Sequence, residues 1–423
     1  MAEEPAPDGT SRLRHERDDA HYVRRLGGAA SDSTVTDASA GRTDEALADE
    51  TPSELRTTRK PHTSRRALMP RRPRGSAAPA ESTSARRGAA AAPASARRQS
   101  WARRHPGALI AATVTLVVLA IGSVAWWSAA RAANHVYGGR PLYVNPDSAA
   151  ARAAESSATA AQAEAAGIIA AQPTGIWLTP EKMPINRVRD EVGASMADSA
   201  TALPIFVVYG ITDRDCGGSD ANAGQSAGGL TPSQYLEWVE QIAAGIGKGR
   251  AIVVLEPDSI ALSVACPDPE GRLQLVSRAL ERLDVSGAIV YLDGGHSDWL
   301  PARQMAELLR TAGVDRARGF ATNVSNTQST GAERAYAARV SALLDGSHAI
   351  IDTSRNGSGP PADGEWCNPP GITLGERPRV ITDDLLDAVL WVKPPGESDG
   401  LCNGGPPAGD WWPEQAVALA GTG

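Results

Sequence analysis

Acidic side chains follow several of the apolar runs in the second half of this 423-residue chain. Asp213 and Asp215 follow one run, and four others each follow a run of their own: Asp258, Asp293, Asp352 and Asp399. A single aspartate after a strand is usually a helix N-cap or a turn residue. Several aspartates that converge on one place can serve two kinds of chemistry. They can bind a hard metal ion, or they can act as paired carboxyl groups in acid and base catalysis.

Aromatic residues favour the second of these uses. Only 4% of the chain is aromatic, yet five rings lie at or next to these runs: Trp177, Tyr209, Trp299, Trp366 and Trp391. Each tryptophan taken singly could be a core residue, but flat rings beside carboxylates suit stacking against sugars. A metal hydrolase would be expected to bring histidine ligands, and after residue 131 there are only three: His135, His296 and His348. We therefore expect a carbohydrate site with no metal and no other cofactor.

Seven short apolar runs must position these side chains. They occupy 175–180, 203–210, 251–258, 288–295, 319–326, 348–356 and 388–400. Their length and Val/Ile content are typical of buried parallel strands. The stretches between them predict helices, one of which starts at Thr231 and Pro232, and the Ala-rich stretch 149–171 predicts a further helix ahead of the sheet.

The expected fold is an α/β fold, a distorted seven-stranded parallel (β/α) barrel. Strands that alternate with helices imply a parallel sheet. No Gly-x-Gly-x-x-Gly follows the first run, which disfavours a dinucleotide-binding fold. The carboxyl ends of barrel strands share one face, where the aspartates would meet.

The first 106 residues have a different composition from the rest. They contain 20 Lys or Arg and 14 Asp or Glu, whereas the remainder contains 22 and 35. Because residues 1–106 have no sustained apolar period and almost no aromatic residue, we expect a disordered basic tail. The acidic balance of the remainder argues against a nucleic-acid partner.

Residues 107–130 form an uncharged run that is long enough to cross a bilayer. Arginines precede this run, so a retained transmembrane anchor would leave the tail in the cytoplasm. A cleaved signal peptide is the alternative. Both interpretations place residues 131–423 outside the cytoplasm, either secreted or anchored to the cell membrane.

All four cysteines lie in this exported part: Cys216, Cys266, Cys367 and Cys402. An even number of cysteines in an exported protein indicates disulfides. No Cys-x-x-Cys pair is present, so a structural zinc site is the weaker interpretation.

Four sequence blocks carry a specific resemblance to a known family. They are YGITDRDCGG followed by SAGG, VLEPDSIAL, YLDGGHSDW and WVKPPGESDG, with support from TNVSN and DTSRNG. Together they resemble glycoside hydrolase family 6, the inverting β-1,4-glucanases, from about Tyr143 to Ala418. The resemblance implies that residues 131–423 form a catalytic domain that hydrolyses β-1,4-glucan.

The resemblance also implies roles for single residues. Asp258 corresponds to the general acid, Asp215 to the aspartate that supports the acid and the water, and Asp399 to the candidate base. Tyr209 corresponds to the tyrosine near the distorted sugar ring, and Ser226 to the water-positioning serine. The implied substrate-binding residues are Trp177, Asp293, His296, Trp299, Asn323, Trp366, Lys393 and Glu397. The implied disulfides are Cys216–Cys266 and Cys367–Cys402.

Inverting cleavage needs one protonated carboxyl group for the leaving oxygen and a second group that activates water. Asp258 would ordinarily be ionised at neutral pH. We expect the nearby charge of Asp215 to raise its pKa, with burial acting in the same direction.

The length of the loops over the cleft distinguishes enzymes that cleave inside the polymer from those that act from its ends. Members of the family that act from chain ends carry longer loops over the cleft, whereas only 34 residues lie between Cys367 and Cys402. We therefore expect a monomeric endo-β-1,4-glucanase acting on cellulose or a mixed-linkage β-glucan. The alternatives are a cellobiohydrolase and a catalytically inactive, membrane-displayed glucan-binding module.

Overall fold

The computed structural model describes residues 135–216 and 228–423, together with Val117 and Ile121. Its helices are α4 (Ala149–Ser156), α5 (Ala160–Ala170), α6 (Val188–Asp198), α7 (Pro232–Ile246), α8 (Ser259–Leu262), α9 (Pro269–Leu283), α10 (Ala302–Thr311), α11 (Thr330–Leu343) and α12 (Pro413–Ala420). Its strands are β1 (Ile176–Leu178), β2 (Ile205–Val208), β3 (Ala251–Leu255), β4 (Ala288–Asp293), β5 (Gly319–Thr322), β6 (His348–Asp352), β7 (Arg379–Val380) and β8 (Leu386–Leu390).

The expected tail (1–106) lies outside the described residues, and so does the expected membrane segment (107–130) apart from Val117 and Ile121. Within the part of the chain that is described, no helix combines the length and the apolar character needed to cross a membrane.

One sheet of eight strands forms the centre of the domain, in the order β1-β2-β3-β4-β5-β6-β8-β7. The α/β architecture is confirmed, and each of the seven predicted runs contains or overlaps one of the seven parallel strands. The prediction of a purely parallel sheet was wrong, because β7 pairs with β8 in the antiparallel direction. A strand of two residues is too short to leave a periodic signal in the sequence.

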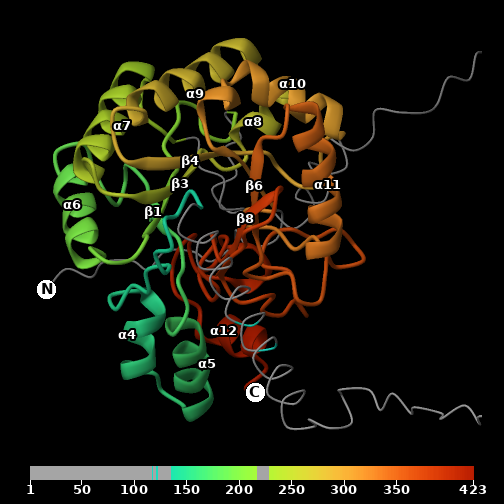
Figure 1. Ribbon diagram of the computed structural model, residues 1–423. Helices are drawn as coiled ribbons and strands as arrows, with labels where there is room; N and C mark the ends of the chain where they lie inside the picture. Colours follow the sequence, from blue (N-terminus) through green and yellow to red (C-terminus); the bar gives the residue numbers. More distant parts are fainter. Residues whose placement is uncertain (1–116, 118–120, 122–134, 217–227) are drawn as a thin grey trace, which may run out of the picture. The chain divides into compact units, whose positions relative to one another are not determined.

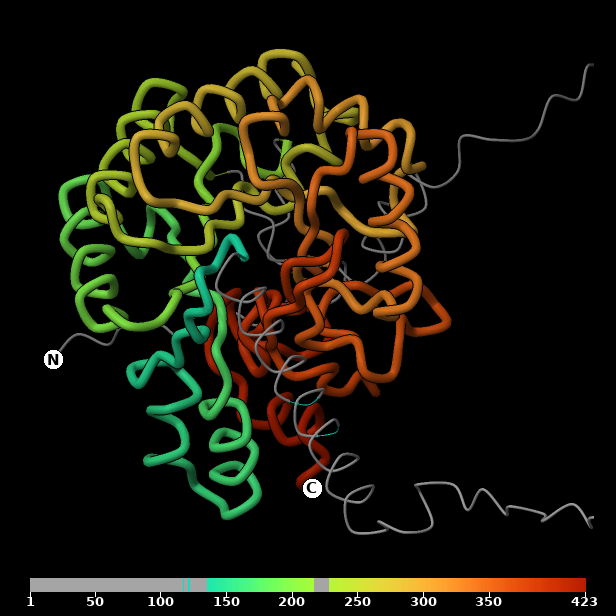
Figure 2. The backbone as a smooth tube through the Cα atoms, in the orientation of Figure 1, coloured from blue at the N-terminus to red at the C-terminus, as the bar shows by residue number. Residues whose placement is uncertain are grey.

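The sheet curls until its first strand approaches the end of β8. Thr174 and Trp391 form an isolated parallel bridge, and the backbone N–H of Gly175 donates to the Trp391 carbonyl oxygen at 2.9 Å. A Cβ at Gly175 would lie 2.3 Å from the carbonyl oxygen of Val392, so this close approach requires glycine. In Figures 1 and 2 the helices from α6 to α11 lie outside the curled strands.

Alternate side chains of the strands enter two separate cores. In β3, Val253 and Leu255 pack with the helices, whereas Ile252 and Val254 point into the interior of the curled sheet. Tyr137, from the segment before the first helix, fills that interior as well. Each fully buried Val or Leu contributes about 1.5–3 kcal/mol to folding, and burial on both sides explains why the strands are continuous apolar runs.

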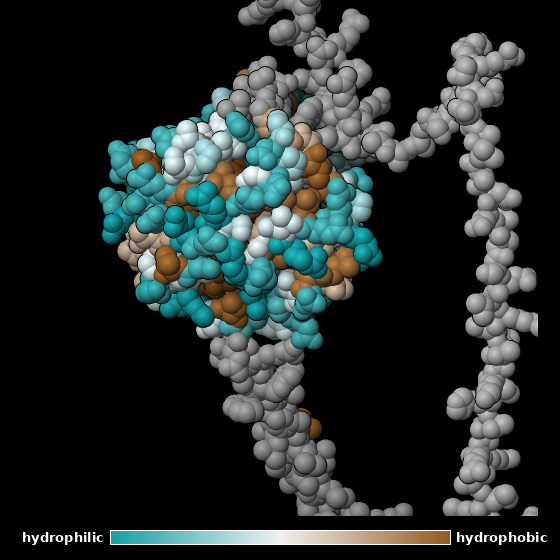
Figure 3. Space-filling view, turned by 90° about the horizontal axis from the view of Figure 1, so that it is seen from above, coloured by the Kyte–Doolittle hydropathy of each residue, from teal (hydrophilic) through white to brown (hydrophobic). Residues whose placement is uncertain are grey.

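Local signals in the sequence set several helix boundaries. Thr231 caps α7 and Pro232 occupies its first turn, as predicted, and Gln234 completes a capping box. The single helix expected at 149–171 is instead the pair α4 and α5, because Thr159 caps a new helix start. Outside the cores the surface is mainly hydrophilic, with scattered hydrophobic residues on the face drawn in Figure 3.

Candidate active site

Asp258 follows β3 and occupies the N-cap position of α8, but its side chain makes no capping bond. None of the described residues hydrogen-bonds to its carboxyl group. Its backbone is left-handed (φ 67°), as is that of Glu256 (φ 51°), a conformation that costs non-glycine residues about 1 kcal/mol or more. Asp258 is partly buried. Strained backbone around such a carboxyl group, with no described hydrogen-bond partner, is typical of a functional site.

The surroundings of Asp258 favour its protonated form. Burial raises its pKa well above the ordinary value, and the negative charges of Asp293, Asp215 and Asp399 add to the shift in that order. A raised pKa suits a general acid, because the carboxyl group must still hold its proton when the substrate arrives. Asp215 acts in the expected direction, but Asp293 has the larger effect.

Asp293, at the end of β4, is buried directly behind Asp258. Its Oδ1 accepts hydrogen bonds from the backbone N–H groups of Asp258 (3.1 Å) and Gly295 (3.0 Å). Burial raises its pKa to about 7 even though these two bonds lower it. The sequence suggested a substrate contact here, but only 1% of Asp293 is exposed. It holds the backbone of Asp258 and repels that residue's charge instead.

Asp215 lies in the loop after β2 and is also buried. The Tyr209 hydroxyl donates to its Oδ1 at 3.0 Å, and the Tyr209 ring meets the Trp177 ring edge-on, with centroids 5.4 Å apart. The Trp177 indole N–H donates to the Val392 carbonyl oxygen, which fixes the ring next to the loop after β8. Asp215, Tyr209 and Trp177 therefore form one connected group across the first two strands.

Asp399, in the loop after β8, is held as an anion. Its Oδ2 accepts from Arg355 Nη1 at 2.7 Å and from the backbone N–H of Asn368 at 2.9 Å, and Lys393 Nζ lies 3.4 Å from Oδ1. Burial alone would raise its pKa, but Arg355 and Lys393 outweigh burial and lower it. The site thus combines one carboxyl group that favours its proton with another that releases it.

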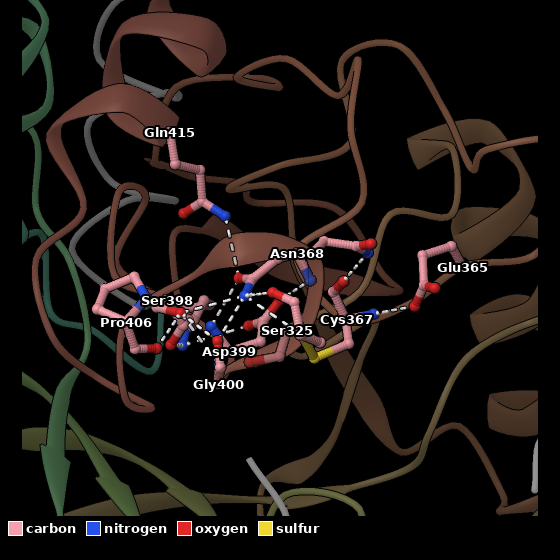
Figure 4. The surroundings of a disulfide bond; sticks show 12 residues. Ser325, Glu365, Cys367, Asn368, Ser398, Asp399, Gly400, Pro406 and Gln415 are labelled. Carbon is pink, nitrogen blue, oxygen red and sulfur yellow. Dashed lines mark hydrogen bonds and ion pairs between the residues drawn. A yellow bond between two sulfur atoms is a disulfide. The ribbon is translucent and has the colours of Figure 1, made fainter. Parts of the chain in front are cut away.

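Asn368 organises the loops around Asp399, as Figure 4 shows. Its amide nitrogen donates to the Ser398 hydroxyl and to the Gly400 carbonyl oxygen, while its amide oxygen accepts from the Asp399 N–H and from Gln415. The neighbouring residue, Cys367, pairs with Cys402. The other disulfide joins Cys216 to Cys266, so both implied pairings are confirmed.

The remaining predicted residues divide into two groups. Trp299 and His296 are partly buried neighbours with ring centroids 5.5 Å apart, and burial lowers the His296 pKa to about 4. Trp366 is half-buried beside Cys367, and Lys393 Nζ lies 5.8 Å from the Trp177 ring centroid. Glu397 is half-buried, and burial raises its pKa. His296, Trp299, Trp366 and Glu397 retain surface for a ligand, whereas Lys393 is buried and its Nζ donates to the Ser398 carbonyl oxygen.

Two residues do not fit the expectations from the sequence. Asn323 is fully buried, and its amide is saturated by backbone groups that include the carbonyl oxygen of Asp352 (2.8 Å) and the N–H of Gln328 (2.9 Å). It therefore shapes its loop, and its implied role in substrate binding stays a prediction. Trp391 is 1% exposed and is a core residue. Ser226 lies outside the described residues.

Three buried charged residues hold the strand ends together; sequence reasoning missed Glu256 and Arg355, and it named Asp352 only as one of the converging aspartates. Glu256 accepts the backbone N–H groups of Gly210 and Ile211, and burial raises its pKa to about 7. Asp352 accepts four backbone N–H groups, from Ser325, Ser354, Val392 and Lys393. Arg355 is fully buried against Asp399. The sequence signal that could have identified them is a charged residue inside a run of otherwise apolar or small residues. A charged group is buried only where it has partners, so this pattern indicates a structural interaction at that position.

Within 135–216 and 228–423, no group of three or more His, Cys, Asp or Glu side chains is arranged to hold a metal ion. The arrangement itself can support acid–base chemistry, because one carboxyl group can donate a proton while an ionised one lies nearby.

The fold and the site together define a class of protein. A curled α/β half-barrel whose strand ends combine such a pair of carboxyl groups with partly exposed aromatic rings has the parts of a glycoside hydrolase. The family model for glycosyl hydrolases family 6 matches residues 137–422, and the chain belongs to this family.

Known members of the family are similar over most of this region. Endoglucanase A of Cellulomonas fimi is 46% identical over 234 residues, which are 55% of this chain and 50% of that enzyme, so the match spans half of the relative. A solved endoglucanase of Mycobacterium tuberculosis, in complex with a thio-linked cellobioside, is 40% identical with a TM-score of 0.63, covering 68% of this chain and 99% of that one. A probable cellobiohydrolase of Aspergillus niger is 34% identical, over 66% of this chain and 72% of that protein.

Proposed function

We propose that this protein is an endo-β-1,4-glucanase that hydrolyses internal bonds of cellulose or a related β-glucan with inversion of configuration. The observation that carries the proposal is the pairing of Asp258, whose pKa is raised, with Asp399, whose pKa is lowered, at one end of the sheet. Family membership supports the reaction class.

In this mechanism Asp258 donates its proton to the glycosidic oxygen as the bond to the leaving sugar breaks. A water molecule attacks the anomeric carbon from the opposite face of the ring. Asp215, oriented by the Tyr209 hydroxyl, supports the acid and orders the water. Asp399 is the candidate base. Its ion pairs keep it anionic. It accepts the proton that the attacking water releases as the new C–O bond forms, directly or through a second water molecule.

The partly exposed aromatic rings are the proposed substrate platforms. Trp177, Trp299 and Trp366 each retain an exposed part near a strand end, where a ring can stack on a glucose unit. The solved relative that is 40% identical binds a cellobioside of this chemical class.

We infer endo action from two observations. Only 34 residues separate Cys367 from Cys402, which leaves little chain to roof the cleft there. The relatives named endoglucanases also reach 46% and 40% identity, above the 34% of the probable cellobiohydrolase.

We propose further that residues 131–423 form the catalytic domain and act outside the cytoplasm, where the two disulfides would persist. Residues 107–130 would serve as the export signal or membrane anchor, and residues 1–106 as a cytoplasmic tail.

Viscometry combined with reducing-end assays tests the function. The full chain, with its disulfides formed, is incubated with carboxymethylcellulose and with barley β-glucan. We expect viscosity to fall much faster than reducing ends accumulate, and both changes to vanish in Asp258→Ala. Reducing ends that keep pace with viscosity would instead indicate a cellobiohydrolase, and a folded but inactive protein would indicate a glucan-binding module.

A further inference from the structure

Arg272, in the first turns of α9, reaches from the helix to both loops that carry the proposed catalytic aspartates. It is 7% exposed. Its Nη1 donates to the Ser259 hydroxyl at 3.1 Å, and Ser259 directly follows Asp258. Its Nη2 donates to the carbonyl oxygens of Arg214 (2.9 Å) and Asp213, the two residues before Asp215. One guanidinium group therefore spans the two loops.

The loop before Asp215 needs such a tie. Asp213 and Cys216 both have left-handed backbone, with φ values of 47° and 57°, which strains residues other than glycine. The side chain of Arg214 points away from its own carbonyl oxygen, to the Tyr209 carbonyl oxygen and to Glu181. Hydrogen bonds from a charged donor are about twice as strong as neutral ones, so Arg272 can hold this conformation.

The disulfide and Arg272 link the same two segments. Cys216 is bonded to Cys266, three residues before α9 begins at Pro269. The disulfide fixes the far side of the loop, whereas Arg272 fixes the side that leads directly to Asp215. The two constraints together leave Asp215 little freedom to move relative to Asp258.

The charges around Arg272 agree with this role. Burial lowers its pKa, and the negative charges of Glu256, Asp215 and Asp213 oppose that shift. The carboxyl group of Asp215 is thus one of the anions that stabilise the buried guanidinium, in addition to the backbone contacts.

We propose that Arg272 is a positioning residue that sets the separation between Asp215 and Asp258 by tying their loops to the start of α9. The proposal rests on the glucanase function proposed above. It assigns no contact between Arg272 and the substrate. Arg272 acts through the placement of Asp215, and a displacement of about 1 Å in a catalytic group can cost about 100-fold in rate.

A double-mutant cycle tests this on the full chain with a defined soluble cello-oligosaccharide. We expect Arg272→Gln to lower kcat by about 10- to 100-fold while KM changes by less than about threefold. Arg272→Lys keeps the positive charge but loses the two separate Nη donors of the guanidinium group. Its kcat should therefore lie between those of wild type and Arg272→Gln. Arg278→Gln, at an exposed position on the same helix, is the matched control and should match wild type.

The decisive variant is Arg272→Gln combined with Asp215→Ala. If Arg272 acts by placing Asp215, the double variant should be no slower than Asp215→Ala alone, within about threefold. Losses that multiply, or an Arg272→Gln kcat equal to that of wild type, would overturn the proposal.

Two controls separate the placement of Asp215 from an effect on folding and from failure of the proposed function. Unfolding midpoints are measured for every variant, and if Arg272→Gln does not fold, the same cycle is run with Arg272→Lys. A lower unfolding midpoint with unchanged kcat would show a purely structural role and overturn the proposal. If wild type fails to cleave the oligosaccharide, the proposed function fails, whatever the Arg272 variants do.

Discussion

The two ends of the curled sheet surround an aspartate in opposite ways. At the carboxyl end, no described residue hydrogen-bonds to the carboxyl group of Asp258, and its pKa is raised by burial and by neighbouring carboxylates. At the amino end, Asp387 is fully buried in β8. It accepts hydrogen bonds from Tyr291 at 2.6 Å and from Arg318 at 2.7 and 2.9 Å, and pairs with His135 at 2.9 Å. Burial would raise the pKa of Asp387, but Arg318, Tyr291 and His348 lower it.

This contrast shows at which end of the sheet the fold tolerates a carboxyl group that has no hydrogen-bond or ion-pair partner among the described residues. A buried carboxyl group without partners destabilises the folded state, whereas one with a bidentate arginine does not. The carboxyl group without a described partner lies at the carboxyl end of the strands, where barrel enzymes carry their active sites, and the fully partnered one lies at the opposite end. Three experiments test this contrast, in order of the expected effect.

Removal of the acid should have the largest effect. We expect Asp258→Asn to lower kcat on carboxymethylcellulose by about 10²–10⁴-fold, because the proton donor is lost. The unfolding free energy in urea at pH 7 should stay the same or rise, because no described partner loses a bond. A clear fall in stability would show that Asp258 has a structural role and would weaken the contrast.

At the amino end, the same substitution should act on stability. We expect Asp387→Asn to lower the unfolding free energy by about 3 kcal/mol, since Arg318 and its neighbours lose a buried anion. At urea concentrations below its unfolding transition, the kcat of Asp387→Asn should equal that of wild type. An impaired kcat in the folded state would mean that the two ends are coupled.

A smaller effect should appear in the pH profile of kcat/KM. In the proposed mechanism Asp258 must be protonated, so the alkaline limb should follow its raised pKa, with activity falling as pH rises through that value. Of the three like charges, Asp293 has the largest effect on the Asp258 pKa, so Asp293→Asn should shift the limb to lower pH, whereas Asp215→Asn should shift it less. An unchanged limb in Asp293→Asn would rule out Asp293 as the dominant charge.

Local patterns in the chain were enough to predict the strands, the motifs and the types of chemistry. Val/Ile runs that are buried on both faces predicted seven parallel strands, because parallel sheets leave no polar face. The aspartates that follow these runs were predicted to meet at one end, because parallel strands share a carboxyl end. The start of α7 was also set by a local signal, since Thr231, Pro232 and Gln234 lie within four consecutive positions of the chain.

The behaviour of each charged group depends on contacts between distant segments. Asp258 and Asp399 are the same residue type, yet one has no described partner and the other has Arg355, which is 44 residues away in the chain. Asn323 and Trp391 matched the site by motif and position, but the fold buries both. The link from Arg272 to Asp213 spans 59 residues and leaves no local pattern. A pKa depends on burial and on neighbouring charges, which distant segments supply, and therefore follows from the fold.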